Sequence, residues 1–238
     1  MIYSRSRNAG KIDPLSLGVS YFEYQITDGA VAQWRLGESG GTIMTDTTGN
    51  LRHGTYSSVG LANASIIPTE ITTSTCAYFN GSSYSSAATG SWMNLSEFSV
   101  EAVVEYNNSY DQAVVSRVYN SGSSNWPWSL DLYTTSIGFW GRTPTGGYQE
   151  ASKTGVSSGI YHLVGTWKDN DFVQLYINGI LEASLAVTGN IYMPANPISI
   201  GRMGNQGNFM HGRIQGVAMY DKVLTNTQIS SHFDATGL

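Results

Sequence analysis

Residues 161–187 have the sequence YHLVGTWKDNDFVQLYINGILEASLAV, which predicts three consecutive antiparallel strands. The first two strands, 161–167 and 172–177, are rich in β-branched and aromatic residues, and a polar turn separates them. Asn178 and Gly179 lie between the second strand and the third. Both residues tolerate the positive φ angles of a type I′ turn, so a tight turn is predicted there. The segment is therefore a predicted antiparallel meander.

Residues 98–105 show the same kind of pattern nearer the N-terminus. Phe98, Val100, Ala102 and Val104 alternate with more polar neighbours, and a period of two residues is typical of a strand with one face on a hydrophobic core. Further strands are predicted at residues 30–36, 77–79, 114–119, 128–133, 136–141, 198–201 and 212–220. The chain is therefore predicted to be all-β.

One short helix is predicted near the C-terminus. Thr225 and Gln228 fit a capping box, in which the Thr hydroxyl accepts a hydrogen bond from the Gln backbone N–H. Ile229 and Phe233 lie four residues apart, so they would form one apolar edge of the helix. We expect this helix to pack on a sheet and to carry no chemistry.

The composition agrees with a single β-rich domain and excludes several classes of function. Apolar residues make up 41% of the 238 residues and charged residues 12%. The net charge of −5 argues against nucleic-acid binding. No segment approaches the roughly 20 apolar residues needed to cross a bilayer, so no membrane insertion is expected. The single cysteine, Cys76, excludes an internal disulfide and lies in an apolar stretch, which predicts a buried thiol.

Several short motifs occur in succession along the chain: WRLGE at 34–38, DTTGN at 46–50, HGTY at 53–56, FNGSSY at 79–84, FSVEA at 98–102, LYING at 175–179 and AMYDKVL at 218–224. This succession resembles the laminin-G-like modules of the concanavalin A-like superfamily. The resemblance implies a two-sheet antiparallel jelly-roll sandwich, in a superfamily that holds both lectins and glycosidases. We assign residues 25–238 to this domain and residues 1–24 to an N-terminal arm or linker.

The start of this domain carries a second resemblance. Residues 24–38, YQITDGAVAQWRLGE, are similar to the lead-in of laminin-G-like modules in phage tail and virion-surface proteins. This implies a virion protein made in the host cytoplasm, whose arm contacts other virion proteins through Arg5, Arg7 and Lys11. No apolar run typical of a secretory signal follows these basic residues. A homo-oligomer and a cytoplasmic location stay open.

Three functions compete at this point. The first is a non-enzymatic virion surface or appendage protein, displayed outward for assembly or for attachment to host-surface glycans. The second is a stand-alone carbohydrate-binding module, and the third is a glycosidase. Glycosidases need two carboxyl groups within about 5–10 Å of each other, and the E-x-D-x-x-E-like pattern of superfamily glucanases is absent. Glu101 and Glu105 share a predicted strand face but would lie roughly 13 Å apart. We therefore expect no close acid pair and no enzyme activity.

Glycan binding requires an exposed aromatic face with a few fixed polar groups. The candidate residues are Trp126, Trp140, Arg142, Tyr148, Asn205 and Asn208. Trp126 precedes Pro127 in a predicted loop, so we expect its side chain to be exposed. The alternative for the strand tryptophans, Trp128, Trp140 and Trp167, is that they fill the core.

A structural calcium ion is the one cofactor that the family resemblance suggests. Glu38 and Asp46 could supply carboxylate oxygens to such an ion. The final strand, however, has Gln215 and Gly216 where relatives often have acidic residues. Hydrogen bonding that fixes the first turn is therefore the favoured role of Glu38 and Asp46. The four histidines show no metal-binding spacing and are expected to be structural.

Overall fold

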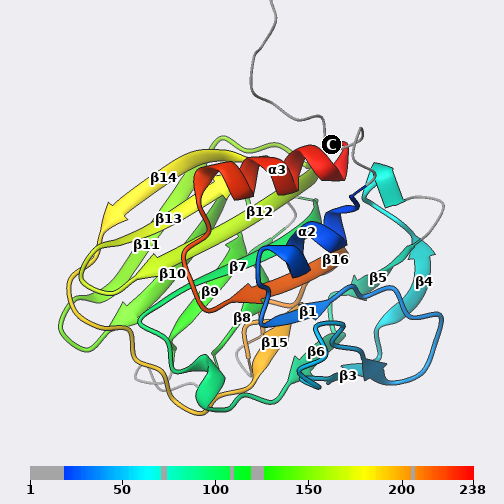
Figure 1. Ribbon diagram of the computed structural model, residues 1–238, viewed down its shortest axis with the longest axis horizontal. Coiled ribbons are helices and arrows are strands. Elements are labelled where there is room, and N and C mark those ends of the chain that lie inside the picture. Colours follow the sequence, from blue (N-terminus) through cyan, green and yellow to red (C-terminus); the bar gives the residue numbers. More distant parts are fainter. Residues whose placement is uncertain (1–18, 71–73, 108–109, 119–125, 205–206) are drawn as a thin grey trace, which may run out of the picture.

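The computed structural model describes residues 19–70, 74–107, 110–118, 126–204 and 207–238. Within these residues, two antiparallel sheets of eight strands each are stacked face to face, and two α-helices lie on the outside of one of them (Figure 1). The expected all-β jelly-roll sandwich is therefore confirmed. The predicted C-terminal helix is present, together with a second helix that we did not predict.

The first sheet has the strand order β14-β13-β12-β7-β16-β5-β4, and β1 pairs with residues 217–219 of β16, beyond the segment that pairs with β5. Its strands are β1 (Ala32–Trp34), β4 (Gly60–Ala64), β5 (Thr75–Asn80), β7 (Glu97–Tyr106), β12 (Gly159–Lys168), β13 (Phe172–Ile177), β14 (Ile180–Ala186) and β16 (His211–Tyr220). The predicted meander is present as β12, β13 and β14. Asn178 and Gly179 have φ angles of 51° and 77°, as a type I′ turn requires.

The second sheet has the strand order β11-β10-β9-β8-β15-β6-β3-β2. Its strands are β2 (Ile43–Met44), β3 (Gly54–Ser57), β6 (Tyr84–Ala87), β8 (Gln112–Ser116), β9 (Trp128–Leu132), β10 (Ser136–Thr143), β11 (Gly147–Thr154) and β15 (Ile198–Ile200). Two short 3-10 helices, η1 (Pro68–Glu70) and η2 (Ser91–Met93), lie in the connections. We did not predict β2, β3, β4, β6 or β11; the sequence of β11, GYQEASKT, lacks a clear apolar alternation.

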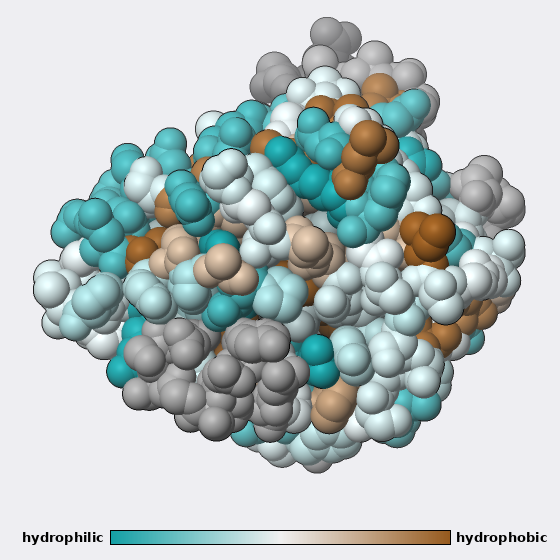
Figure 2. Space-filling model, turned by 90° about the horizontal axis from the view of Figure 1, so that it is seen from below, coloured by the Kyte–Doolittle hydropathy of each residue, from teal (hydrophilic) through white to brown (hydrophobic). Residues whose placement is uncertain are grey.

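The main core lies between the two sheets and is built by alternate residues of each strand. Phe98, Val100, Ala102 and Val104 of β7 all face this core, as their period of two predicted. Close approach of the sheets depends on small residues: a Cβ at Gly165 would lie 2.3 Å from Cγ of Phe139. On the face shown in Figure 2, hydrophobic residues form small separate patches among polar ones.

The two helices cover the outer face of the first sheet side by side (Figure 1). Helix α3 (Asn226–Thr236) begins at the predicted capping box of Thr225 and Gln228 and ends at Gly237, whose φ of 74° is left-handed. Helix α2 (Tyr21–Thr27) lies before the first predicted strand, residues 30–36, in a stretch where we predicted no helix. It also begins with a capping box, between Ser20 and Glu23.

Helix α2 overlaps the region assigned to the N-terminal arm. Tyr21 and Phe22 are buried against the first sheet. Residues 1–18, including the predicted anchor residues Arg5, Arg7 and Lys11, lie outside the described residues. The domain boundary at residue 24 therefore stays a prediction.

Candidate ligand-binding site

Four of the six predicted glycan-contact residues converge at one end of the second sheet. Trp140 and Arg142 lie on β10, and Tyr148 on β11 is the direct cross-strand partner of Arg142. Trp126 lies in the segment that leads into β9, and its ring packs on Trp140 with a centroid distance of 6.3 Å. Residues two apart on a strand share a face, so these side chains gather on the outer face of this sheet.

The three aromatic rings form a row in which the buried Trp140 lies between Trp126 and Tyr148. Trp140 is buried, and its ring centroid lies 5.1 Å from that of Tyr148. Tyr148 is 53% exposed. Trp126 is half-buried rather than exposed as we expected, because it rests on Trp140. Trp128 and Trp167 fill the main core, as the alternative predicted, whereas Trp140 is buried in a separate cluster.

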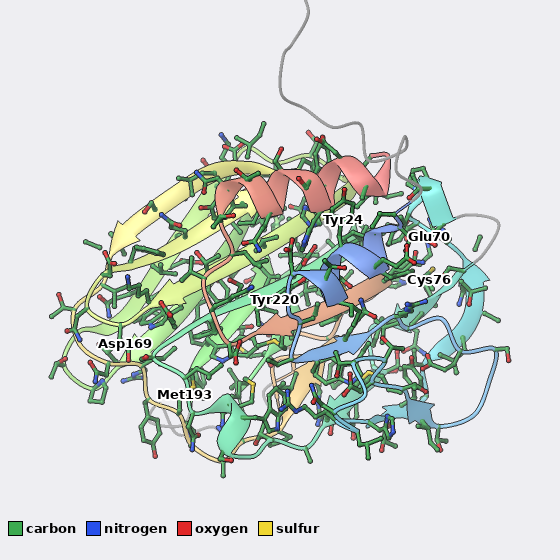
Figure 3. All side chains as sticks on the ribbon, viewed as in Figure 1. Tyr24, Glu70, Cys76, Asp169, Met193 and Tyr220 are labelled. Carbon is green, nitrogen blue, oxygen red and sulfur yellow. The ribbon has the colours of Figure 1, made fainter. Side chains whose placement is uncertain are left out.

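A pocket of about 430 Å³ opens beside this row. It is lined by Trp126, Arg142, Thr143, Pro144, Gly147 and Tyr192. Tyr192, which the sequence analysis did not single out, comes from the loop after β14 and is 43% exposed. That loop passes the end of the sandwich marked by Met193 and Asp169 in Figure 3. A pocket with aromatic walls and one cationic side chain is suited to a small polar ligand that has an apolar face.

Backbone hydrogen bonds hold the three segments of the pocket together. The Arg142 N–H donates to Pro127 O at 2.9 Å, and the Tyr192 N–H donates to Arg142 O at 3.1 Å. Thr143 Oγ1 donates to Thr188 O at 2.7 Å and accepts from the Gly146 N–H at 2.8 Å. The pocket is therefore framed by fixed backbone contacts, which favours a pre-formed site.

A buried acid on the neighbouring strand β9 forms a hydrogen bond with Trp140, the central ring of the aromatic row. Asp131 on β9 accepts a hydrogen bond from Trp140 Nε1 at 2.6 Å and another from the Ser129 hydroxyl. Its side chain is buried, and burial raises the pKa of Asp131 to about 7 despite these donors. Asp131 therefore fixes the orientation of the Trp140 ring on which Trp126 rests.

A second acid lies close to Asp131, so the expectation that no two carboxyl groups come together is wrong. The Tyr133 hydroxyl lies 2.9 Å from Glu150 Oε1 on β11 and 3.4 Å from Asp131 Oδ2 on β9. Strand β10 separates these two acids in the sheet, and Gly138 of β10 leaves room for Glu150, since a Cβ there would lie 2.1 Å from Glu150 Oε1. Sequence spacing along one strand could not show this pair.

The pair does not form an open catalytic centre. Asp131 is 1% exposed, and its carboxylate oxygens are held by Ser129, Trp140 and Tyr133. A glycosidase acid must contact the glycosidic oxygen of its substrate. Asp131 has no such access in this structure.

Glu101, the first of the two acids compared in the sequence, is a structural group. It is wholly buried on β7, and its carboxylate is hydrogen-bonded to His162 at 2.7 Å, Tyr220 at 2.6 Å and His232 at 3.1 Å. Tyr220 lies on β16 in the layer beneath the helices (Figure 3). Burial opposes ionisation, but the charge of His232 and the hydrogen bonds from both histidines hold the pKa of Glu101 well below its usual range.

Two of the histidines therefore have a shared structural role that their separate places in the sequence did not reveal. His232 of α3 also contacts Asp28 at 2.9 Å. Burial works against its protonation, yet the Glu101 charge and the Asp28 hydrogen bond raise the pKa of His232 to about 9. Glu105, in contrast, forms two hydrogen bonds of 2.9 Å with Arg213 near the surface. Glu101 and Glu105 thus serve separate contacts.

The candidate calcium ligands are engaged in hydrogen bonds that fix the first turn. Asp46 accepts from the backbone N–H groups of Gln33, Thr48 and Arg52 at 2.9–3.1 Å. Glu38 accepts from the Thr45 N–H at 2.8 Å and from the Tyr56 hydroxyl. Among the described residues, no three His, Cys, Asp or Glu side chains are grouped as a metal site. A cation at Glu38 and Asp46 would have to displace these donors.

The remaining predicted residues lie elsewhere. Asn208 is exposed and lines a separate pocket of about 590 Å³, together with Tyr110 and Asp111. Asn205 lies outside the described residues.

Cys76 is buried as predicted, with Sγ 2.9 Å from Ala64 O, and burial raises the pKa of its thiol to about 11. None of the helices in the described ranges is both long and apolar enough to cross a membrane.

Comparison with solved structures identifies the same fold in bacterial toxins. The binding domain of botulinum neurotoxin serotype D superposes with a TM-score of 0.66 at 16% identity, over 87% of this chain and 51% of that one. The binding domain of Paraclostridial Mosquitocidal Protein 1 gives 0.66 at 17% identity, over 87% and 52%. The receptor-binding domain of the botulinum neurotoxin C/D mosaic serotype gives 0.65 at 15%, over 87% and 51%. The chain thus spans about half the length of these structures.

No curated protein sequence matches the chain. A family model does: the model described as "Concanavalin A-like lectin/glucanases superfamily" matches residues 77–230. This range extends from β5 to α3 and includes the whole aromatic pocket. Because the match covers more than half of the chain and agrees with the observed sandwich, the protein belongs to the concanavalin A-like lectin/glucanase superfamily.

Proposed function

We propose that this protein is a non-enzymatic attachment domain that binds glycans in the pocket between Trp126, Arg142 and Tyr192. The single observation that carries the proposal is the convergence of these side chains, from three separate segments, around one cavity of about 430 Å³. Ligand pockets typically have volumes of roughly 300–1,000 Å³. This cavity is therefore large enough for one or two sugar rings.

The chemistry of the walls supports sugar as the ligand. The C–H faces of a sugar ring are apolar and pack on aromatic rings, whereas the ring's edges carry hydroxyl groups that require polar partners. Trp126 and Tyr192 supply aromatic surface, and Arg142 supplies donors. Tyr148, 53% exposed beside Arg142, extends the aromatic surface beyond the cavity.

Two findings support binding rather than catalysis. The similar solved structures are described as binding domains, although they show the fold alone. In this chain the close acid pair includes Asp131, which is buried and held by its own neighbours. We therefore propose that Asp131 and Glu150 serve the architecture of the site.

We propose a virion appendage as the setting for this attachment role. The support is the similarity of residues 24–38 to the lead-in of laminin-G-like modules in phage tail and virion-surface proteins. Residues 1–24, with Arg5, Arg7 and Lys11, would then join the domain to other virion proteins. Removing residues 1–18 should abolish incorporation into particles while leaving glycan binding intact; incorporation that persists would contradict this setting.

A glycan array tests the binding function. Wild-type protein should bind a defined set of glycans, and Trp126→Ala should lose that binding because it removes an aromatic wall. Trp92→Ala is the matched control, since Trp92 is also half-buried but packs under Arg52 at a different place. An array without hits, or a Trp126→Ala variant that binds as well as the control, would refute the proposal.

An incubation with the bound glycans tests the absence of catalysis. We expect no new reducing ends over extended incubation. Hydrolysis that disappears in Glu150→Gln would show that the acid pair is catalytic after all.

A further inference from the structure

The arginine in the pocket differs from the other arginines that the structure describes. Five of the six have a visible partner: Arg35 packs over Phe22, Arg52 over Trp92 and Arg202 over Tyr84, Arg117 donates to Met93 O, and Arg213 pairs with Glu105. Arg142 has no hydrogen bond, ion pair or ring contact from its guanidinium within the described parts of the chain. Its positive charge is therefore free for a ligand.

The surroundings of Arg142 make this free charge significant. The side chain is half-buried on the outer face of β10, between Tyr148 and the pocket. None of the pocket-lining residues is acidic, although the whole chain has 17 Asp and Glu against 12 Lys and Arg. A partly desolvated cation without a counter-ion is costly. An anionic ligand group would remove that cost.

Thr143, a second polar side chain of the pocket beside Arg142 and the Tyr192 hydroxyl, is already occupied. Thr143 Oγ1 donates to Thr188 O and accepts from the Gly146 N–H and from Gln149 Nε2. It has no hydrogen left to offer to a ligand, because a hydroxyl has a single donor. The guanidinium of Arg142, with five N–H donors in a planar fork, is thus the main polar group available to a ligand here.

We infer that the pocket is specific for sugars that carry a carboxylate, such as sialic or uronic acids. The inference rests on the proposed glycan-binding function and names its ligand class. The planar fork of arginine matches a carboxylate in a bidentate pair, while Trp126 and Tyr192 contact the sugar ring. Charge-assisted bidentate pairs are roughly twice as strong as neutral hydrogen bonds, so the acidic sugar should bind at least about ten-fold more tightly than its neutral counterpart.

Calorimetry with matched sugars tests this inference on the whole 238-residue chain. The probes are 3′-sialyllactose against lactose, trigalacturonate against its methyl ester, and lactose 3′-sulfate. The variants are Arg142→Gln and, as a control, Arg35→Gln, which removes one positive charge from an exposed residue that follows β1 of the first sheet. We expect a preference for at least one carboxylate over its neutral match, lost in Arg142→Gln and retained in Arg35→Gln.

Each other outcome overturns a defined part of the argument. Equal binding of acidic and neutral sugars, or a preference that survives Arg142→Gln, would refute the role of Arg142 and leave the glycan-binding function standing. Equal binding of the sulfate and the carboxylates would refute the carboxylate specificity. Failure of every sugar here and on the array would refute the proposed function itself.

Discussion

Replacing Glu101 by Gln should destabilise the protein strongly without touching the ligand pocket. The wholly buried carboxylate of Glu101 has three hydrogen-bond partners, His162, Tyr220 and His232. An amide keeps the shape but removes the charge, and its N–H₂ group would face donors. His232 would then be left with only Asp28 as a negatively charged partner within this cluster. Removing one member of a buried ion pair costs about 3–5 kcal/mol.

Urea unfolding followed by tryptophan fluorescence would measure this change. In a thermal melt, a loss of 3–5 kcal/mol in the free energy of unfolding would lower the melting temperature of a chain of this length by about 6–20 °C. Glu105→Gln is the matched control: the same substitution on the same strand breaks a partly exposed pair with Arg213, which should cost about 1 kcal/mol or less. Equal, small losses for both variants would show that the buried cluster does not hold the helices to the sheet.

Three further predictions concern the described core. The pKa of His232 is raised to about 9 in the folded protein, against about 6.5 in the unfolded chain. Protonated His232 therefore adds fully to the free energy of unfolding below pH 6.5, and this contribution is lost as the pH rises through 9. His232→Gln should flatten this decline when unfolding is measured over a range of pH. Burial raises the pKa of Asp131 to about 7, so the folded state favours the protonated carboxyl group. The free energy of unfolding should therefore fall as the pH rises from about 4 to 7. Asp131→Asn, which cannot ionise, should be no less stable than the wild type in thermal melts at pH 8. Gly165→Ala would force a methyl group into Phe139 and should cost about 1–3 kcal/mol in chemical denaturation; a neutral effect would contradict the close packing of the sheets.

The features that the sequence predicted well depend on local physics. Asn178 and Gly179 give a type I′ turn because few other residues adopt their φ angles, and Thr225 with Gln228 marks a helix start through contacts within one turn. The same capping signal at Ser20 and Glu23 was present before α2. The capping-box rule that predicts α3 therefore predicts this helix as well.

The features that the sequence could not supply depend on contacts between distant segments. The acid Glu101 lies 61 residues before His162 and 131 residues before His232 in the sequence. No local pattern marks the three residues as partners. Asp131 on β9 and Glu150 on β11 lie close together because both strands pair with β10, whose Gly138 leaves room for the Glu150 side chain. Tyr192 reaches the pocket through a loop whose path only the assembled sandwich determines. Pairing between strands, not composition, positions all of these groups.

The most direct test of the binding site uses the indole N–H signals of ¹⁵N-labelled protein. The glycan that binds most tightly on the array would be titrated while these signals are recorded. The signal of Trp126, in the pocket wall, should shift during the titration, whereas that of Trp34, buried in the main core with its indole N–H on Arg52 O, should not move. A saturating glycan that leaves the Trp126 signal in place would show that the ligand binds elsewhere and that this pocket is not the site of attachment.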